Sequence, residues 1–307
     1  MSLHVIFLGT AGSVPTPKRN LPAILIKRED EHIMFDCGES VQRQMIKARA
    51  GFHKKMKVLI THMHGDHVLG LPGLLQTMAL LNRERKLEIY GPRGIRRFVE
   101  GIRETVQFVL TFPVEIHEIE RKGVVCEEEE YFICAEWANH VIPDLAYALV
   151  EKPRPGKFYP NKAKALGVPE GALWSKLQRG HSVNLSDGRI VKPEDVMGLP
   201  RTGRKIVYTG DTRASENLAK FAAGADLLIH EATLDDNLAE KAEEDGHSTP
   251  SQAAETAKKA EAKRLILTHI SARYKSVNAL LEQARKVFPN TQVAEDFMKI
   301  EIPLLDT

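Results

Sequence analysis

The stretch T-H-M-H-G-D-H at Thr61–His67 places three imidazoles and a carboxylate within six positions. The apolar run Val58–Ile60 precedes it and predicts a short buried strand, so the polar residues fall on the loop that follows. Imidazole nitrogens and carboxylate oxygens are ligands that zinc accepts in catalytic sites. His62 and His64 can approach one ion, which leaves Asp66 and His67 for a neighbouring ion. The stretch therefore predicts a pair of divalent metal ions rather than a polar loop that happens to be rich in histidine.

Three further candidate ligands follow strand-like runs farther along the chain. His140 follows C-A-E-W-A-N, Asp211 follows I-V-Y-T-G, and His269 follows L-I-L-T. Binding residues commonly gather on loops at one end of a rigid sheet. Taken alone, each of these two histidines is more often a structural residue. Together with the first cluster they complete a ligand set for two ions, provided that Asp211 bridges the pair.

Glu231 and His247 form a second candidate pair. A carboxylate beside an imidazole can hold a proton ready for a leaving oxyanion, which is the general-acid role. Two structural alternatives stand beside that role. Glu231 could orient a metal-bound histidine from outside the ligand shell. His247 could mark the start of a helix, because Ser248 or Thr249 beside Pro250 resembles a helix cap.

The bulk properties describe an ordinary chain without membrane segments. Its 307 residues suffice for one large α/β domain or two smaller ones, and a net charge of +2 argues against a general binder of polyanions. No signal peptide and no apolar run of transmembrane length are evident. Cys37, Cys126 and Cys134 are odd in number and lack a C-x-x-C pattern. We therefore expect a cytoplasmic protein without thiolate zinc sites.

Short strands mixed with helices, in two successive groups, predict a layered α/β architecture with sheets inside and helices outside. The predicted strands are Val5–Leu8, Ala23–Ile26, Ile33–Phe35, Val58–Ile60, Val114–Ile119, Tyr131–Trp137, Leu145–Val150, Ile206–Tyr208, Leu227–Ile229 and Leu265–Leu267. The predicted helices are Val41–Ala50, Leu71–Leu81, Gly94–Val106, Pro250–Lys263 and Val277–Phe288.

The segment 151–195 departs from this pattern. It is rich in Pro, Gly, Lys and Arg and has poor strand or helix periodicity, which is unusual inside a compact domain and indicates an inserted protrusion or a linker. Its cations neutralise phosphates and its rings Phe158 and Tyr159 can stack on bases, unless the segment is simply a solvated basic loop. The cations are Lys152, Arg154, Lys157, Lys162 and Lys164.

Two other stretches carry clustered cations. The run from Arg43 to Lys57 contains six basic residues and no acidic one, and it indicates either a flank of the active site or the solvated face of a helix. Lys18, Arg19 and Asn20 lie in the loop after the first strand. On residue chemistry alone this loop is an ordinary turn set by its two prolines.

The spacing H-x-H-x-D-H, a distant His, a distant Asp in T-G-D-T and a final His resemble the metallo-β-lactamase superfamily. The resemblance implies a four-layer αββα sandwich with a dinuclear zinc site between the sheets. It assigns one zinc to His62, His64, His140 and Asp211. It assigns the other to Asp66, His67, Asp211 and His269. These ions would generate a hydroxide near neutral pH for hydrolysis of phosphodiesters, esters or lactams.

Finer motifs resemble the ribonuclease Z family in its short form. They are G-T-A-G-S-V-P-T-P-K-R-N at Gly9–Asn20, F-D-C-G-E-S with Q-R-Q at Phe35–Gln44, H-E-A-T at His230–Thr233 and the basic segment. The resemblance runs from Gly9 to Phe297. It implies a zinc-dependent endoribonuclease that removes the 3′ trailer of precursor tRNA after the discriminator nucleotide, leaving a tRNA 3′-hydroxyl and a trailer 5′-phosphate.

The same resemblance suggests further roles. Asp66 would be the proton acceptor, and Glu231 with His247 would supply the acid. The loop of Lys18, Arg19 and Asn20 would help to sense a CCA end. The segment 151–195 would be an arm that grips tRNA bound at the other subunit of a homodimer. Each subunit would hold two Zn²⁺, with other divalent metals possible.

We therefore expect a single metallo-β-lactamase-like domain over residues 1–307, with a tRNA-binding arm inserted at 151–195. One alternative is another dinuclear-zinc phosphodiesterase or an arylsulfatase of the same superfamily. The basic insertion and the P-T-P-K-R-N loop disfavour it, because a small substrate needs neither. The other alternative is a non-catalytic RNA-binding protein with a structural metal. Structural zinc sites are normally closed tetrahedra, which does not fit so many candidate ligands.

Overall fold

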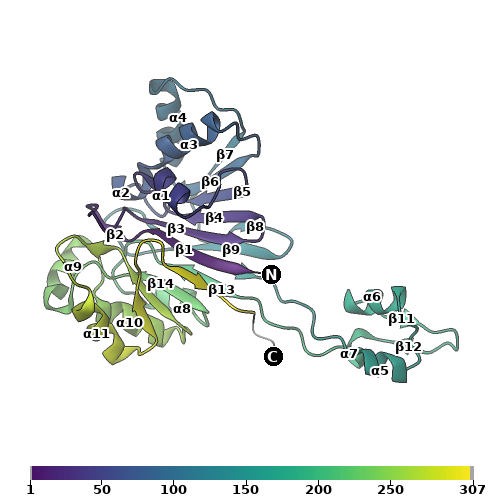
Figure 1. The fold of residues 1–307 in the computed structure, drawn as a ribbon. Helices are drawn as coiled ribbons and strands as arrows, with labels where there is room; N and C mark the ends of the chain where they lie inside the picture. The colour runs from purple at the N-terminus through teal and green to yellow at the C-terminus, as the bar shows by residue number, and fades with distance from the viewer. Residues whose placement is uncertain (1, 305–307) are drawn as a thin grey trace. The chain divides into compact units, whose positions relative to one another are not determined.

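The structure is a computed structural model that describes residues 2–304. The chain forms two compact units, a larger one from residues 2–150 and Lys205–Pro303 and a smaller one from Glu151–Arg204. Every helix within residues 2–304 is too short or too polar to cross a bilayer. The larger unit holds two stacked sheets with helices on both outer faces (Figure 1), which confirms the predicted four-layer αββα sandwich.

The first sheet carries the strand that leads into T-H-M-H-G-D-H. Its strands, in spatial order, are β18 (Lys299–Glu301), β1 (Leu3–Gly9), β3 (Ala23–Arg28), β4 (Glu31–Phe35), β5 (Lys55–Leu59), β6 (Leu87–Pro92) and β7 (Val114–Ile119). The strands from β4 to β7 run parallel, whereas β18, β1, β3 and β4 pair antiparallel. Strand β5 is buried over Met56–Leu59, as a strand covered on both faces requires.

The second sheet sets the remaining candidate ligands at one edge. Its strands, in spatial order, are β17 (Thr291–Val293), β15 (Leu265–Thr268), β14 (Leu227–Glu231), β13 (Lys205–Tyr208), β10 (Leu145–Glu151), β9 (Tyr131–Trp137) and β8 (Gly123–Glu127). Strands β13, β14, β15 and β17 are parallel. Because parallel strands end at the same edge, the residues that follow β13 and β15 and the last residue of β14 meet there.

Three apolar layers hold the sandwich together. Between the sheets, the Phe35 ring stacks on Tyr147 and Tyr208 at centroid separations of 6.0 and 5.7 Å. One outer face is covered by α1 (Val41–Lys47), α3 (Leu71–Leu80) and α4 (Ile95–Thr105), and the other by α8 (Glu216–Phe221), α10 (Pro250–Lys259) and α11 (Asn278–Val287) (Figure 1). Thr249 caps α10 in a capping box with Gln252, so the predicted cap beside Pro250 is present.

All strands and helices predicted for the larger unit are present, with ends shifted by a few residues. The sequence did not indicate β6, β8, β17, β18, α8 or α9 (Ala239–Asp245). Strands β17 and β18 have only three residues each, which is too short for a clear apolar pattern. Strand β8 is largely exposed, so its sequence also lacks such a pattern. Helix α10 ends before the predicted Lys263, because Glu261 adopts a left-handed φ of 50°.

The smaller unit has a core of its own. It contains α5 (Pro160–Ala165), α6 (Ala172–Gln178), β11 (Val183–Asn184), β12 (Ile190–Val191) and α7 (Pro193–Val196). Ala163, Val168, Leu177 and Val191 are among its buried residues. Each element has seven residues or fewer, which explains the poor periodicity of the sequence. The unit extends to Arg204, beyond the 151–195 expected from composition, because the Arg204 guanidinium pairs with the buried Glu151 carboxylate at 2.7 Å.

Candidate metal centre

The seven candidate ligands come together at one edge of the sandwich. His62 and His64 follow β5, and Asp66 and His67 lie on the short helix α2 (Gly65–Val68) rather than on an irregular loop. His140 lies in the loop between β9 and β10, Asp211 follows β13, and His269 follows β15. His62, His67, Asp211 and His269 are almost completely buried, whereas the other three are partly exposed. Loops from both sheets thus build a partly open polar site on a rigid frame.

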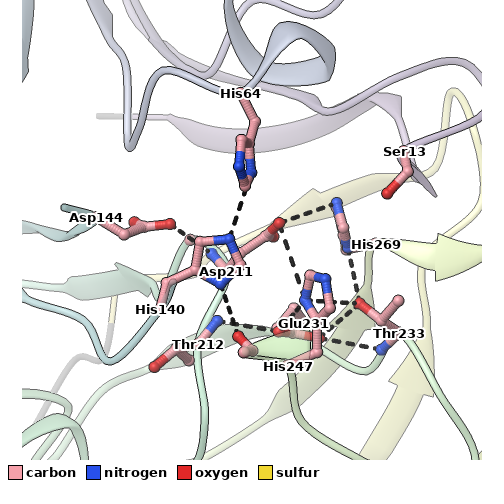
Figure 2. A network of polar contacts seen from close by, with 12 residues as sticks. Ser13, His64, His140, Asp144, Asp211, Thr212, Glu231, Thr233, His247 and His269 are labelled. Carbon is pink, nitrogen blue, oxygen red and sulfur yellow. Dashed lines mark hydrogen bonds and ion pairs between the residues drawn. The ribbon is translucent and has the colours of Figure 1, made fainter. Parts of the chain in front are cut away.

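Their donor atoms form two overlapping groups. On one side, His64 Nδ1 lies 3.0 Å from His62 Nε2 and 3.3 Å from His140 Nε2. On the other, Asp66 Oδ2 lies 3.5 Å from His67 Nε2 and 3.4 Å from His269 Nε2. The Asp211 carboxylate lies between these groups, with Oδ2 placed 3.8 Å from His62 Nε2 and 3.3 Å from His269 Nε2 (Figure 2).

These separations fit bound metal ions. Two ligands of a tetrahedral ion, each about 2.1 Å from the metal, lie about 3.4 Å apart. In addition, Asp211 Oδ1 is buried without a hydrogen-bond partner among residues 2–304. A buried carboxylate oxygen left unpaired is costly, and a cation would satisfy it. The nitrogen and oxygen donors are those of a divalent metal site.

In the metal-free site, burial and neighbouring carboxylates shift the pKa values of the histidines in opposite directions and keep Asp66 ionised. Burial lowers the pKa of His62 to about 4. Burial opposes ionisation of Asp66, but hydrogen bonds with His269 and His67 outweigh it and hold the Asp66 pKa far below its usual range. For His67, burial is outweighed by Asp36 and Asp211, which raise its pKa well above the ordinary value. A net negative carboxylate pair among imidazoles attracts a divalent cation.

Two buried carboxylates that sequence reasoning missed orient the histidines. Asp36, which follows β4, lies 2.7 Å from His67 Nδ1. It also accepts hydrogen bonds from the Thr61 amide and the Tyr208 hydroxyl, at 2.8 and 2.9 Å. Asp144 lies 2.8 Å from His62 Nδ1. Carboxylates placed behind Nδ1 fix the ring so that Nε2 points to the centre. The motif F-D-C-G-E-S contains the only sequence signal for Asp36, and none marked Asp144.

Glu231 and His247 lie beside the centre and contact each other. Glu231 Oε1 lies 2.8 Å from His247 Nδ1, and the fully buried carboxylate also accepts hydrogen bonds from the Thr212 amide and the Thr233 hydroxyl (Figure 2). Burial lowers the pKa of His247, but the Glu231 carboxylate outweighs it and raises that pKa to about 9. His247 therefore carries a proton at neutral pH in the metal-free protein.

The structural alternatives for this pair are also partly realised. The Thr233 hydroxyl lies 2.8 Å from His269 Nδ1, so Glu231 supports a candidate ligand through Thr233 rather than by direct contact. His247 lies just before the cap residue Thr249 of α10. The two roles are compatible, because the start of α10 places His247 at the edge of the sheet where β14 delivers Glu231.

The predicted RNA-binding residues lie in different surroundings. Lys18 is exposed, but the Arg19 guanidinium donates to Thr10 Oγ1 at 2.7 Å and the Asn20 side-chain Nδ2 donates to the Glu39 carbonyl at 2.8 Å. In the run from Arg43 to Lys57, Arg43 and Lys47 are exposed. Lys57 is fully buried and bonded to Glu31 and Glu128, at 2.8 and 2.7 Å, which removes it from any RNA surface.

In the smaller unit, Lys157, Lys162 and Lys164 are exposed, whereas Lys152 and Arg154 are half-buried. Tyr159 is 37% exposed with Lys162 Nζ 4.9 Å from its ring centroid. Phe158 instead packs against Trp174 at 5.2 Å. Tyr159 is thus the ring of this pair that is available for stacking.

Comparisons with known proteins agree with the fold. A family model described as Anti-Pycsar protein Apyc1 matches residues 3–100, and one described as a beta-lactamase superfamily domain matches residues 178–270. A metallo-beta-lactamase fold protein from Bacillus subtilis superposes with a TM-score of 0.70 at 18% identity, covering 98% of this chain and all of that one. The fold is therefore the metallo-β-lactamase fold, and its clustered histidine and aspartate side chains could hold divalent metal ions.

Similarity over the whole chain narrows this class. A ribonuclease Z from Methanosarcina acetivorans is 49% identical over 98% of both chains, and one from Methanothermobacter thermautotrophicus is 47% identical over 99% of this chain and 98% of its own. The crystal structure of human tRNase Z, short form, matches with a TM-score of 0.73 and 33% identity over 98% of this chain and 99% of that chain. The chain belongs to the ribonuclease Z family, the tRNA 3′-processing endonucleases of this superfamily.

Proposed function

We propose that the chain cleaves precursor tRNA after the discriminator nucleotide with two Zn²⁺ ions per subunit, leaving a tRNA 3′-hydroxyl and a trailer 5′-phosphate. One observation carries this proposal: seven histidine and aspartate side chains from remote stretches converge beside the Glu231–His247 pair. Family membership favours tRNA over the substrates of another dinuclear-zinc phosphodiesterase or an arylsulfatase. The open, partly exposed site also disfavours a purely structural metal.

His62, His64 and His140 would hold one ion, Asp66, His67 and His269 would hold the other, and Asp211 would bridge them. The groups of donor atoms within mutual reach support this division. When bound, such ions lower the pKa of a water molecule and stabilise negative charge developing on phosphorus. Zinc is proposed because imidazole dominates the ligand set.

Two different side chains would handle the two proton transfers, one from the attacking water and one to the leaving 3′-oxygen. Asp66 would take the proton of the attacking water, or at least orient that water. Its pKa lies far below the usual range, which makes orientation the larger part of its role. The Glu231 carboxylate raises the pKa of His247 and engages its Nδ1, so Nε2 would donate a proton to the departing 3′-oxygen. The new P–O bond leaves the phosphate on the trailer as the bond to the 3′-oxygen breaks.

The smaller unit would be the tRNA-binding arm. A cavity of about 820 Å³ within it is lined by Lys157, Tyr159, Lys162 and Arg179, which combine cations with a stacking ring. We propose RNA contacts for Lys152, Arg154, Lys157, Lys162 and Lys164, and for Lys18 in the larger unit. We further propose a homodimer in which each arm holds the tRNA bound at the other subunit. Three free cysteines favour a cytoplasmic location.

The activity is tested with one purified precursor tRNA and mapping of both product ends. His64→Ala and Asp211→Ala should abolish cleavage while thermal unfolding remains cooperative, because each removes a proposed ligand and leaves the apolar layers intact. Metal analysis of the purified protein should give two zinc ions per chain. Cleavage by fully metal-stripped protein would refute the metal mechanism.

The arm is tested by replacing residues 155–200 with a short glycine–serine linker, which retains the pairing of Arg154 with Arg201 and of Glu151 with Arg204. Processing of precursor tRNA should fall far more than hydrolysis of bis-p-nitrophenyl phosphate. Equal losses on both substrates would remove the arm from recognition. Mixing this variant with His64→Ala subunits should restore processing if arms act across a dimer, and sedimentation should give twice the chain mass.

A further inference from the structure

The segment between β1 and β3, which includes the short strand β2 (Ala11–Gly12), touches the metal centre at Gly12 and Ser13. The Ser13 amide donates a hydrogen bond of 2.9 Å to Asp66 Oδ2. Gly12 lies against the ring of His269, since a Cβ at this position would be only 2.7 Å from His269 Nδ1. Ser13 adopts a left-handed φ of 57°, which a non-glycine residue keeps only when its surroundings hold it there. Figure 2 shows Ser13 on the same side of the centre as His269.

The base of this loop is anchored by Asp296, far away in the sequence. The Asp296 carboxylate accepts hydrogen bonds from Thr10 Oγ1 and from the Asn20 amide, both at 2.8 Å, and these are the two ends of the loop. It accepts a third from Gln44 Nε2 of α1, at 2.9 Å. The Ala11 amide closes the same base by donating to the Asn20 carbonyl at 2.9 Å. One carboxylate thus ties both ends of the loop to the first sheet and its covering helix.

Arg19 completes the anchor from inside the loop. Its Nη1 donates to Thr10 Oγ1 at 2.7 Å and to the Ala294 carbonyl at 2.6 Å. The Thr10 hydroxyl therefore accepts from Arg19 and donates to Asp296. Thr10 is fully buried, and its carbonyl accepts the amide of Ile270, the residue after His269, at 2.9 Å. Hydrogen bonds to Thr10 thus join Asp296 and Arg19 to the chain segment that contacts Asp66 and His269.

We propose that Arg19 and Asp296 are positioning residues for the reaction, acting through Thr10 to hold Ser13 against Asp66 and Gly12 against His269. A charge-assisted hydrogen bond from a backbone amide fixes the carboxylate rotamer, and the glycine contact restricts the imidazole. Arg19 thereby serves the protein's own loop, and Lys18 is the cation of that loop that faces outward. The inference rests on the proposed function, because Asp66 and His269 are metal ligands in that proposal.

The test compares Asp296→Asn and Thr10→Val with wild type. Thr10→Val keeps the side-chain shape but removes the hydroxyl, and Thr10→Ser restores it. Glu295→Gln is the control, because this exposed neighbouring carboxylate lines a surface cavity together with Lys18 and Asp296 but makes no side-chain hydrogen bond to the loop within residues 2–304. Zinc affinity is measured by competition with a chromophoric chelator, without substrate. The kcat and KM are then measured for bis-p-nitrophenyl phosphate and for precursor tRNA.

We expect Asp296→Asn and Thr10→Val to bind one zinc about tenfold more weakly and to lose about tenfold in kcat on both substrates, with KM for the small substrate nearly unchanged. Thr10→Ser and Glu295→Gln should behave as wild type. Unchanged zinc affinity and kcat in folded Asp296→Asn would overturn the inference, as would a loss confined to KM for precursor tRNA. If Asp296→Asn does not fold, the comparison of Thr10→Val with Thr10→Ser tests the inference instead. If the wild-type protein failed to bind zinc or to cleave precursor tRNA, the proposed function would be refuted instead.

Discussion

Replacing Asp36 by asparagine should weaken zinc binding while leaving the protein folded. Asp36 Oδ2 faces both His67 Nδ1, at 2.7 Å, and the Tyr208 hydroxyl, at 2.9 Å, while Oδ1 accepts from the Thr61 amide. If the asparagine oxygen keeps the Thr61 bond, its amide group meets the ring nitrogen of His67. His67 must then accept at Nδ1 and carry its proton on Nε2, which is the atom proposed to bind metal.

The magnitude follows from that change of tautomer. Loss of a carboxylate behind a ligating histidine typically lowers metal affinity by about 10- to 100-fold, or about 1.4 to 2.7 kcal/mol. Loss of charge-assisted hydrogen bonds in a fully buried site should also lower the free energy of unfolding of the metal-free protein by about 2 to 3 kcal/mol. Competition with a chromophoric chelator measures the first quantity, and denaturant unfolding of chelator-treated protein measures the second.

Asp226→Asn is a matched control. Its carboxylate accepts hydrogen bonds from the Lys205 amide and Lys263 Nζ, both at 2.7 Å, and it contacts none of the proposed ligands. This variant should lose stability without losing zinc affinity. If folded Asp36→Asn bound zinc as tightly as wild type, the reasoning that Asp36 sets the tautomer of His67 would be refuted.

Two further predictions concern proton transfer and acid stability. His247→Gln should lower kcat for precursor tRNA by about 100-fold or more while affecting bis-p-nitrophenyl phosphate much less, because p-nitrophenolate leaves without a proton; equal losses on the two substrates would argue against the acid role. Burial of His32 lowers its pKa from 6.5 to about 4, so the unfolded chain takes up a proton that the fold excludes. Stability is therefore retained above pH 6.5 and falls as the pH drops toward 4, by about 3 kcal/mol in total for this residue. Denaturant unfolding between pH 7 and 4 should show a smaller loss for His32→Gln than for wild type, whereas the exposed control His53→Gln should follow wild type; a His32→Gln curve parallel to that of wild type would contradict this account.

Local patterns in the chain predicted sheets covered by helices and the candidate ligands, whereas the four-layer arrangement followed from the family resemblance. His62, His64, Asp66 and His67 stand within six positions, so their proximity follows from the chain itself. His140, Asp211 and His269 were placed by their positions after strands, and parallel pairing of β13, β14 and β15 brings the last two to one edge. Continuous apolar runs were enough to locate β13, β14 and β15, because these strands are buried on both faces.

Tertiary structure alone decided which polar groups support the site. Asp144 and Asp296 follow no motif, and each acts on residues far away in the sequence. Arg19 matched a motif for RNA contact, yet its guanidinium bonds the carbonyl of Ala294, 275 positions along the chain. Hydrogen bonds of this kind depend on how β1, β3 and the turn before β18 are brought together. A side chain's identity fixes what it can donate or accept, whereas only the folded arrangement determines which partner it meets.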